Sequence, residues 1–148
     1  MSDKSQLHSC DIELTVTTMD TWKIVVDEIL KSEAKVILLT GNLGAGKTTL
    51  TQHLVKALGS TSTVTSPTFS LVNVYERLLG PIYHLDLYRL ESYDELFNAG
   101  IEEYFYEKNS YCIVEWPDLI FDTELVKDAL VIKIESGEKS RRVLVSRI

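Results

Sequence analysis

The 148-residue chain has little cysteine, proline or methionine, with two, three and two residues respectively. Cys10 and Cys112 lie far apart without C-x-x-C spacing, so the sequence suggests neither a disulfide framework nor a zinc site. Apolar runs stay far below the roughly 18 residues of a membrane span, and residues 1–10 contain no apolar segment of a signal peptide. These absences predict a reduced, cytoplasmic protein with inert thiols and no membrane partner.

Positive charge is also scarce, because 15 Lys and Arg face 22 Asp and Glu and leave a net charge of −7. Residues 127–148 are the exception, with six basic and three acidic side chains. Affinity for nucleic acid comes mostly from basic groups that neutralise phosphates, so the acidic remainder argues against tight unaided binding of RNA or DNA. The basic end is interpreted as a solvated hairpin or as a docking surface.

The segment from Gly41 to Thr48 reads GNLGAGKT and matches G-x-x-x-x-G-K-[ST] between an apolar strand pattern and a helix pattern, as this phosphate-binding loop requires. Its glycines let backbone N–H groups point at phosphate oxygens, and the following helix adds the positive end of its dipole. Lys47 supplies a charge for the β- and γ-phosphates, and the Thr48 hydroxyl is a ligand for Mg²⁺. The competing interpretation is an ordinary glycine-rich turn. The predicted nucleotide-binding residues are Gly41, Asn42, Leu43, Gly44, Ala45, Gly46, Lys47, Thr48 and Thr49.

Strand and helix patterns alternate along the chain, and 45% apolar with 25% charged residues is ordinary for a globular domain. Hydrophobic periodicity and turn residues predict strands at 12–16, 35–40, 69–75, 82–88, 111–116, 129–135 and 141–148. They predict helices at 17–33 and 48–59, and a third that opens at a Ser92–Glu95 capping box. The expected fold is a single α/β domain over residues 1–148. It is P-loop NTPase-like and three-layered, with a largely parallel central sheet and a C-terminal antiparallel hairpin.

Two acidic residues stand near the ends of predicted buried strands, Asp86 in IYHLDLY and Glu115 in YCIVEW. A phosphate-binding loop needs such a carboxylate for the metal and its waters. Glu115 is favoured as the metal partner beside Thr48, and Asp86 as the carboxylate that orients a metal-bound or attacking water. The plainer alternative for each is a cap or a surface ion pair, and the pattern leaves open which of the two binds the metal directly.

Four strings occur in order, GNLGAGKTT, TSPTFSLVNVY, YHLDLYRL and VEWP, and together they resemble the TsaE family, also called YjeE, of bacterial P-loop ATPases. H-x-D-x-Y-R together with E-W-P is much more specific than the glycine-rich loop alone. The resemblance implies a small cytoplasmic ATPase that works with the TsaB and TsaD proteins in making N6-threonylcarbamoyladenosine in tRNA. It implies contact with tRNA only indirectly, through that complex.

The resemblance carries family roles over to matching residues. Lys47 and Thr48 correspond to the P-loop lysine and the Mg²⁺-ligating threonine, Asp86 to the aspartate of H-x-D-x-Y-R, and Glu115 and Trp116 to E-W-P. Lys47, Asp86 and Glu115 are therefore the expected catalytic residues. Trp116 contacts nucleotide or a partner, or else belongs to the core.

The loop that contains Thr65, Ser66 and Thr68 corresponds to a segment that the family uses like a GTPase switch, although a polar connector explains the composition too. His84, Asp86 and Tyr88 alternate, so on a strand they would share one face. For His84 the plainer interpretation is a hydrogen-bonded strand histidine.

ATP is the expected nucleotide because the N-K-x-D signature of GTP-specific proteins is missing. Arg77 and Arg89 are the arginines between the glycine-rich loop and the last hairpin, and Arg141 and Arg142 lie in that hairpin. With no arginine obviously placed at the γ-phosphate, the expectation is weak ATPase activity that partner proteins stimulate. The main alternative is a small-molecule or nucleoside kinase, disfavoured by size and by the shortage of arginines for a lid. A nucleotide-gated binding module is a third interpretation.

Overall fold

The computed structural model describes residues 12–42 and 44–148 of the chain. Its strands form one seven-stranded sheet in the order β1-β7-β6-β2-β5-β4-β3. The strands are β1 (Ile12–Val16), β2 (Val36–Thr40), β3 (Val72–Tyr75), β4 (Ile82–Asp86), β5 (Tyr111–Glu115), β6 (Leu130–Ser136) and β7 (Arg141–Arg147). The helices are α2 (Met19–Lys31), α3 (Lys47–Ala57), α4 (Tyr93–Asn98) and α5 (Glu102–Tyr106), with 3₁₀ helices η1 (Pro117–Ile120) and η2 (Glu124–Val126). Cys10 and Leu43 lie outside the described residues.

The four central strands, β6, β2, β5 and β4, run parallel to one another. Antiparallel strands close both sides: β3 pairs with β4 on one side, and the hairpin β6–β7 pairs on to β1 on the other. The parallel centre and the C-terminal antiparallel hairpin are therefore confirmed. Parallel strands have their carboxyl ends at one edge of the sheet, and that edge positions the site described below.

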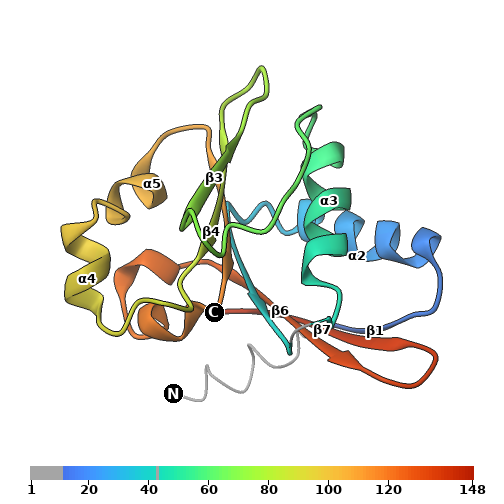
Figure 1. The fold of residues 1–148 in the computed structure, drawn as a ribbon. Helices are drawn as coiled ribbons and strands as arrows, with labels where there is room; N and C mark the ends of the chain where they lie inside the picture. Colours follow the sequence, from blue (N-terminus) through green and yellow to red (C-terminus); the bar gives the residue numbers. More distant parts are fainter. Residues whose placement is uncertain (1–11, 43) are drawn as a thin grey trace, which may run out of the picture.

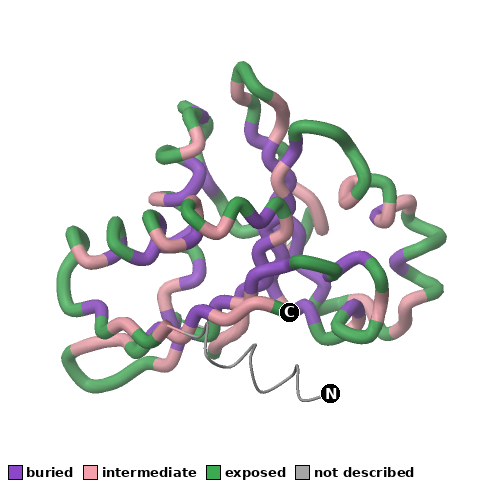
Figure 2. Tube along the Cα trace, turned by 180° about the vertical axis from the view of Figure 1, so that it is seen from behind, coloured by how far each residue is buried: buried purple, intermediate pink, exposed green. Residues whose placement is uncertain are grey.

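Two hydrophobic clusters lie on the two faces of this sheet, which gives three layers. Because strand side chains alternate, β2 sends Ile37 and Leu39 into one cluster and Leu38 into the other. Helices α2 and α3 cover the first face, and α4, α5 and the 3₁₀ helices cover the second (Figure 1). Buried residues gather along the middle of the sheet and exposed ones at the periphery (Figure 2).

Helix positions follow from their apolar spacing and caps. In α2 the buried residues Trp22, Val25, Val26 and Ile29 lie on one face, as their spacing predicts. At α4 the Ser92 hydroxyl accepts the Glu95 N–H at 3.3 Å, so the predicted N-cap is present. Among the described residues, no helix has both the length and the apolar character to cross a membrane.

Some boundaries differ from the prediction. The strand expected from Phe69 begins at Val72, because the Leu71 N–H donates to the Pro67 carbonyl at 2.8 Å and closes a turn that leaves Phe69 85% exposed. The strand expected to reach Tyr88 ends at Asp86, so Tyr88 lies in a turn and does not share a strand face with Asp86.

Short helices account for segments in which the sequence shows no pattern. Residues 117–128 form η1 and η2, and α5 follows α4 after Gly100. Ile120 of η1, Leu125 of η2 and Ile101, the residue before α5, are buried against the second face of the sheet. Burial, rather than periodicity over one or two turns, stabilises these elements.

Candidate functional site

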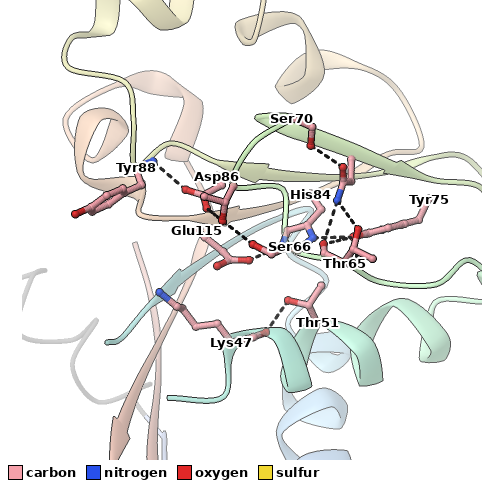
Figure 3. A network of polar contacts seen from close by, with 12 residues as sticks. Lys47, Thr51, Thr65, Ser66, Ser70, Tyr75, His84, Asp86, Tyr88 and Glu115 are labelled. Carbon is pink, nitrogen blue, oxygen red and sulfur yellow. Dashed lines mark hydrogen bonds and ion pairs between the residues drawn. The ribbon is translucent and has the colours of Figure 1, made fainter. Parts of the chain in front are cut away.

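Three segments converge at the carboxyl edge of the parallel strands. The glycine-rich loop joins β2 to α3, and β5 pairs beside β2 with Leu39 opposite Glu115. The next strand, β4, ends with Asp86 opposite Glu115. Figure 3 shows Lys47, at the start of α3, on the same side of the sheet as these two carboxylates. Sheet order therefore brings together the three residues that the sequence predicts to be catalytic.

Positive φ angles shape the loop. Gly41, Gly44 and Gly46 have φ of 148°, 79° and 120°, which L side chains rarely adopt. A Cβ on Gly46 would lie 2.8 Å from the Trp22 ring of α2, so close packing also requires glycine there. The loop thus has the backbone freedom that a phosphate-wrapping turn needs, and α3 begins directly after it.

The Lys47 side chain is nearly buried, with 7% of its surface exposed. Its Nζ donates to the Gly41 carbonyl at 2.8 Å and lies 4.1 Å from the centroid of the Trp116 ring. Burial lowers the pKa of this ammonium, while the negative charges of Glu115 and Asp86 act in the opposite direction. Lys47 therefore lies across the mouth of the loop beside two carboxylates.

Asp86 and Glu115 are 4% and 5% exposed, which excludes the alternative of surface ion pairs. Asp86 accepts the Tyr88 N–H at 2.9 Å and the Thr68 hydroxyl at 3.2 Å. Glu115 Oε2 lies 2.6 Å from Nε2 of His84, which is fully buried. Each carboxylate therefore has a fixed partner, and His84 is the hydrogen-bonded strand histidine of the plainer interpretation, buried behind Glu115.

Trp116 adopts a left-handed backbone conformation, with φ 55° and ψ 60°, directly before Pro117. A bulky residue in this region is uncommon, and such outliers cluster at functional sites. Its ring packs 4.9 Å from that of Tyr88, with the planes inclined by 55°, and Lys47 lies over it. Trp116 is only partly buried, lines the cavity and belongs to neither hydrophobic cluster. It is therefore a cavity residue and not part of the core.

A cavity of about 430 Å³ opens at this point. Its lining residues are Gly44, Gly46, Lys47, Thr48, Thr49, Ser66, Thr68, Tyr88, Glu115, Trp116 and Arg141. Among the predicted site residues, Asp86 and Thr65 do not line the cavity: Asp86 lies behind cavity-lining Thr68, which donates to it, and the Thr65 carbonyl accepts the Tyr75 hydroxyl at 3.1 Å and the Asn73 amide at 3.0 Å. The remaining loop residues, Gly41, Asn42 and Ala45, lie beside the cavity lining within the same turn.

Arg141 is a cavity residue that sequence patterns did not place. Its guanidinium donates to the carbonyls of Ala45 and Gly44, the latter at 3.3 Å. The strand pairing explains why Arg141 reaches the loop. Strand β6 runs parallel to β2, so both end at the edge where the loop begins, and Arg141 is the first residue of β7, opposite Ser136 at the end of β6. Arg89, by contrast, lies 4.7 Å over the ring of exposed Phe69 and does not line the cavity.

The donor set fits a metal that binds mainly through a nucleotide. Within residues 12–42 and 44–148, no group of three or more His, Cys, Asp or Glu is arranged to hold a metal by itself. Mg²⁺ usually takes one or two protein oxygens together with phosphates and waters. Thr48 and Glu115 both line the cavity and supply a hydroxyl and a carboxylate of that kind.

Comparisons with known proteins place the chain among relatives that share one description. The family described as "Threonylcarbamoyl adenosine biosynthesis protein TsaE" matches residues 16–144. The chain is 37% identical to the tRNA threonylcarbamoyladenosine biosynthesis protein TsaE of Bacillus subtilis, over 86% of this chain and 85% of that protein. It is 44% identical to the protein of the same name from Haemophilus influenzae, over 58% of this chain and 54% of the other. The crystal structure of Bacillus subtilis YdiB superposes with a TM-score of 0.71 at 29% identity, covering 93% of this chain and 86% of that one.

Proposed function

Because this chain belongs to the TsaE family, we propose that it is a Mg²⁺-dependent ATPase that supports formation of N6-threonylcarbamoyladenosine in tRNA. The observation that carries the ATPase is the convergence of Lys47, Glu115 and the glycine-rich loop on one cavity. The role in tRNA modification rests on the family and on the names of the relatives. We further propose that the protein acts in the cytoplasm with proteins of the TsaB and TsaD type.

The first task of the site is to hold the phosphates. Backbone N–H groups of the loop donate hydrogen bonds to the phosphate oxygens, and the positive end of the α3 dipole attracts their negative charge. Lys47 exchanges its contact with the Gly41 carbonyl for the β- and γ-phosphate oxygens. Arg141, which also lines the cavity, holds the loop by donating to the Ala45 and Gly44 carbonyls. The loop is therefore braced before nucleotide arrives, which reduces the ordering cost of binding.

The second task is to organise water and charge at the γ-phosphate. Thr48 and Glu115 would hold Mg²⁺, which when bound neutralises charge that develops on the phosphate oxygens. Asp86 is positioned by the Tyr88 N–H and by Thr68, and it orients the attacking water through its remaining acceptor sites. Ser66 and Thr68 bring the switch-like loop to the same cavity.

Slow hydrolysis by the protein alone follows from the positions of the arginines. An arginine supplied to the γ-phosphate raises phosphoryl-transfer rates by roughly 10³ to 10⁵. Arg141 donates from Nε and Nη2 to loop carbonyls, which holds its guanidinium against the loop, and Arg89 lies over Phe69. We therefore propose that a partner protein orders the loop at 65–68 or supplies the missing charge.

Steady-state phosphate release tests this function. Activity is measured for the protein alone, with the TsaB and TsaD proteins, and with tRNA added. The protein alone should release phosphate slowly, and the partner proteins should raise that rate. Rapid turnover that is indifferent to the partners would contradict the accessory role. A labelled phosphoryl group found on a small-molecule acceptor instead of free phosphate would favour the kinase.

A further inference from the structure

A chain of buried hydrogen bonds leads from Glu115 away from the cavity (Figure 3). His84, in the middle of β4, has no exposed surface, and both its ring nitrogens have partners. Nε2 lies 2.6 Å from Glu115 Oε2, and Nδ1 lies 2.9 Å from the Tyr75 hydroxyl. Unpaired polar groups are costly when buried, so this network fixes the imidazole from both sides.

The far end of the chain reaches the switch-like loop. Tyr75 is 3% exposed, and its hydroxyl donates to the Thr65 carbonyl at 3.1 Å and accepts the Thr65 N–H at 3.3 Å. The amide of Asn73 donates to the same carbonyl at 3.0 Å and to Thr65 Oγ1 at 3.1 Å. Three residues later, the Thr68 hydroxyl donates to Asp86. The loop is thus linked to Asp86 directly and to Glu115 through two side chains.

The protons available on His84 and Tyr75 link the position of the loop to Glu115. An ionised carboxylate only accepts, so its short contact with His84 places a proton on Nε2. A ring that carries only this proton accepts at Nδ1, where the Tyr75 hydroxyl reaches it. Tyr75 has one proton for two acceptors, Nδ1 and the Thr65 carbonyl. The position of Thr65 therefore influences which of them receives the proton.

We propose that Tyr75 and His84 are positioning residues that couple the loop Thr65–Thr68 to the orientation of the Glu115 carboxylate. The proposal rests on the ATPase function above. When nucleotide draws the loop toward the cavity, the Thr65 carbonyl leaves Tyr75, which then donates to Nδ1. That bond fixes the imidazole ring from behind, so its Nε2–H holds Glu115 in the working orientation. The ends of the network support this role, since one is a cavity-lining carboxylate and the other adjoins cavity-lining Ser66.

Three variants separate the parts of the link. Tyr75→Phe removes the hydroxyl, His84→Leu removes both contacts, and His84→Gln retains a donor for Glu115 without reaching Tyr75. Tyr83→Phe is the matched control, because Tyr83 is also a buried tyrosine with a hydrogen-bonded hydroxyl, but it lies on β4 and donates to Glu107 at 2.6 Å on the opposite face of the sheet.

Phosphate release by the full-length protein is measured with and without the partner proteins. One lost hydrogen bond in the link predicts a kcat about five- to tenfold lower in Tyr75→Phe, with KM within roughly twofold of wild type. His84→Gln should match Tyr75→Phe, and Tyr83→Phe should match wild type. In a His84→Leu background, Tyr75→Phe should have no additional effect, because Tyr75 acts through His84. Wild-type kcat in Tyr75→Phe, or additive effects in the double variant, would overturn the proposal.

A second measurement does not require hydrolysis. Nitrogen-15 NMR of the His84 ring reports the hydrogen bond at Nδ1 as Mg²⁺ and a non-hydrolysable ATP analogue are added. The Nδ1 resonance should shift in the wild type, because this nitrogen gains the hydrogen bond from Tyr75, and should stay in place in Tyr75→Phe. An unchanged spectrum in the wild type, or equal changes in both proteins, overturns the coupling. If the wild type responds yet releases no phosphate under any condition, the ATPase function fails and the coupling stands.

Discussion

Replacing Lys47 with methionine removes its ammonium while keeping an unbranched stem against Trp116. In the free protein Nζ makes a hydrogen bond to Gly41 at 2.8 Å and a cation–π contact at 4.1 Å. These contribute about 1.5–3 kcal/mol and about 0.5–1 kcal/mol, and both are given up on binding. Two charge-assisted bonds to β- and γ-phosphates return about 3–6 kcal/mol. The net gain of about 1–2 kcal/mol predicts that Lys47→Met weakens nucleotide affinity about five- to thirtyfold.

Calorimetric titration with Mg²⁺ and a non-hydrolysable ATP analogue measures this change, and circular dichroism verifies the fold. Lys56→Met is the control, because Lys56 is an exposed lysine in the last turn of the same helix. It should bind within roughly twofold of wild type, which also removes general charge effects from the comparison. Wild-type affinity in Lys47→Met, or an equal loss in both variants, would refute the assignment of Lys47 to the phosphates.

Three further predictions concern other parts of the molecule. Glu115→Gln should lower phosphate release about a hundredfold while nucleotide affinity by calorimetry changes little; unchanged turnover would remove this carboxylate from the chemistry. Gly46→Ala should lower the free energy of unfolding, measured in urea, by about 2–3 kcal/mol, because its φ of 120° is strained for alanine and its Cβ would lie 2.8 Å from the Trp22 ring. Gly59→Ala should lower it less, because a Cβ there, at φ 98°, has no neighbour within 4 Å. Burial raises the pKa of the Cys112 thiol from 9.0 to about 12, so its contribution to stability is complete below pH 9 and is lost as the pH rises toward 12. Cys112→Ala in a Cys10→Ser background should show a shallower decline over that window, and an equal slope would count against it.

The central strands and the glycine-rich loop before α3 were predictable because their signals are local. An apolar run such as VILLT is typical of a strand covered on both faces, and a glycine-rich loop with Lys47 at the start of a helix has its own spacing. The turn at Phe69 was missed because its apolar side chain suggests a strand, whereas a hydrogen bond to Pro67 decides the backbone. Helices η1 and η2 are too short for periodicity to reveal.

By itself the sequence determined the glycine-rich loop between a strand and a helix, the alternation of strands and helices, and the positions of Asp86 and Glu115 near strand ends. Tertiary structure alone decided the partners of these residues: His84 behind Glu115, Trp116 over Lys47, and the arginine that braces the loop from 97 residues away. Local patterns reflect the backbone geometry of neighbouring residues, which is why the first set could be read directly. Partners across strands depend on the order β6-β2-β5-β4 and on its register, which only packing of the whole sheet establishes.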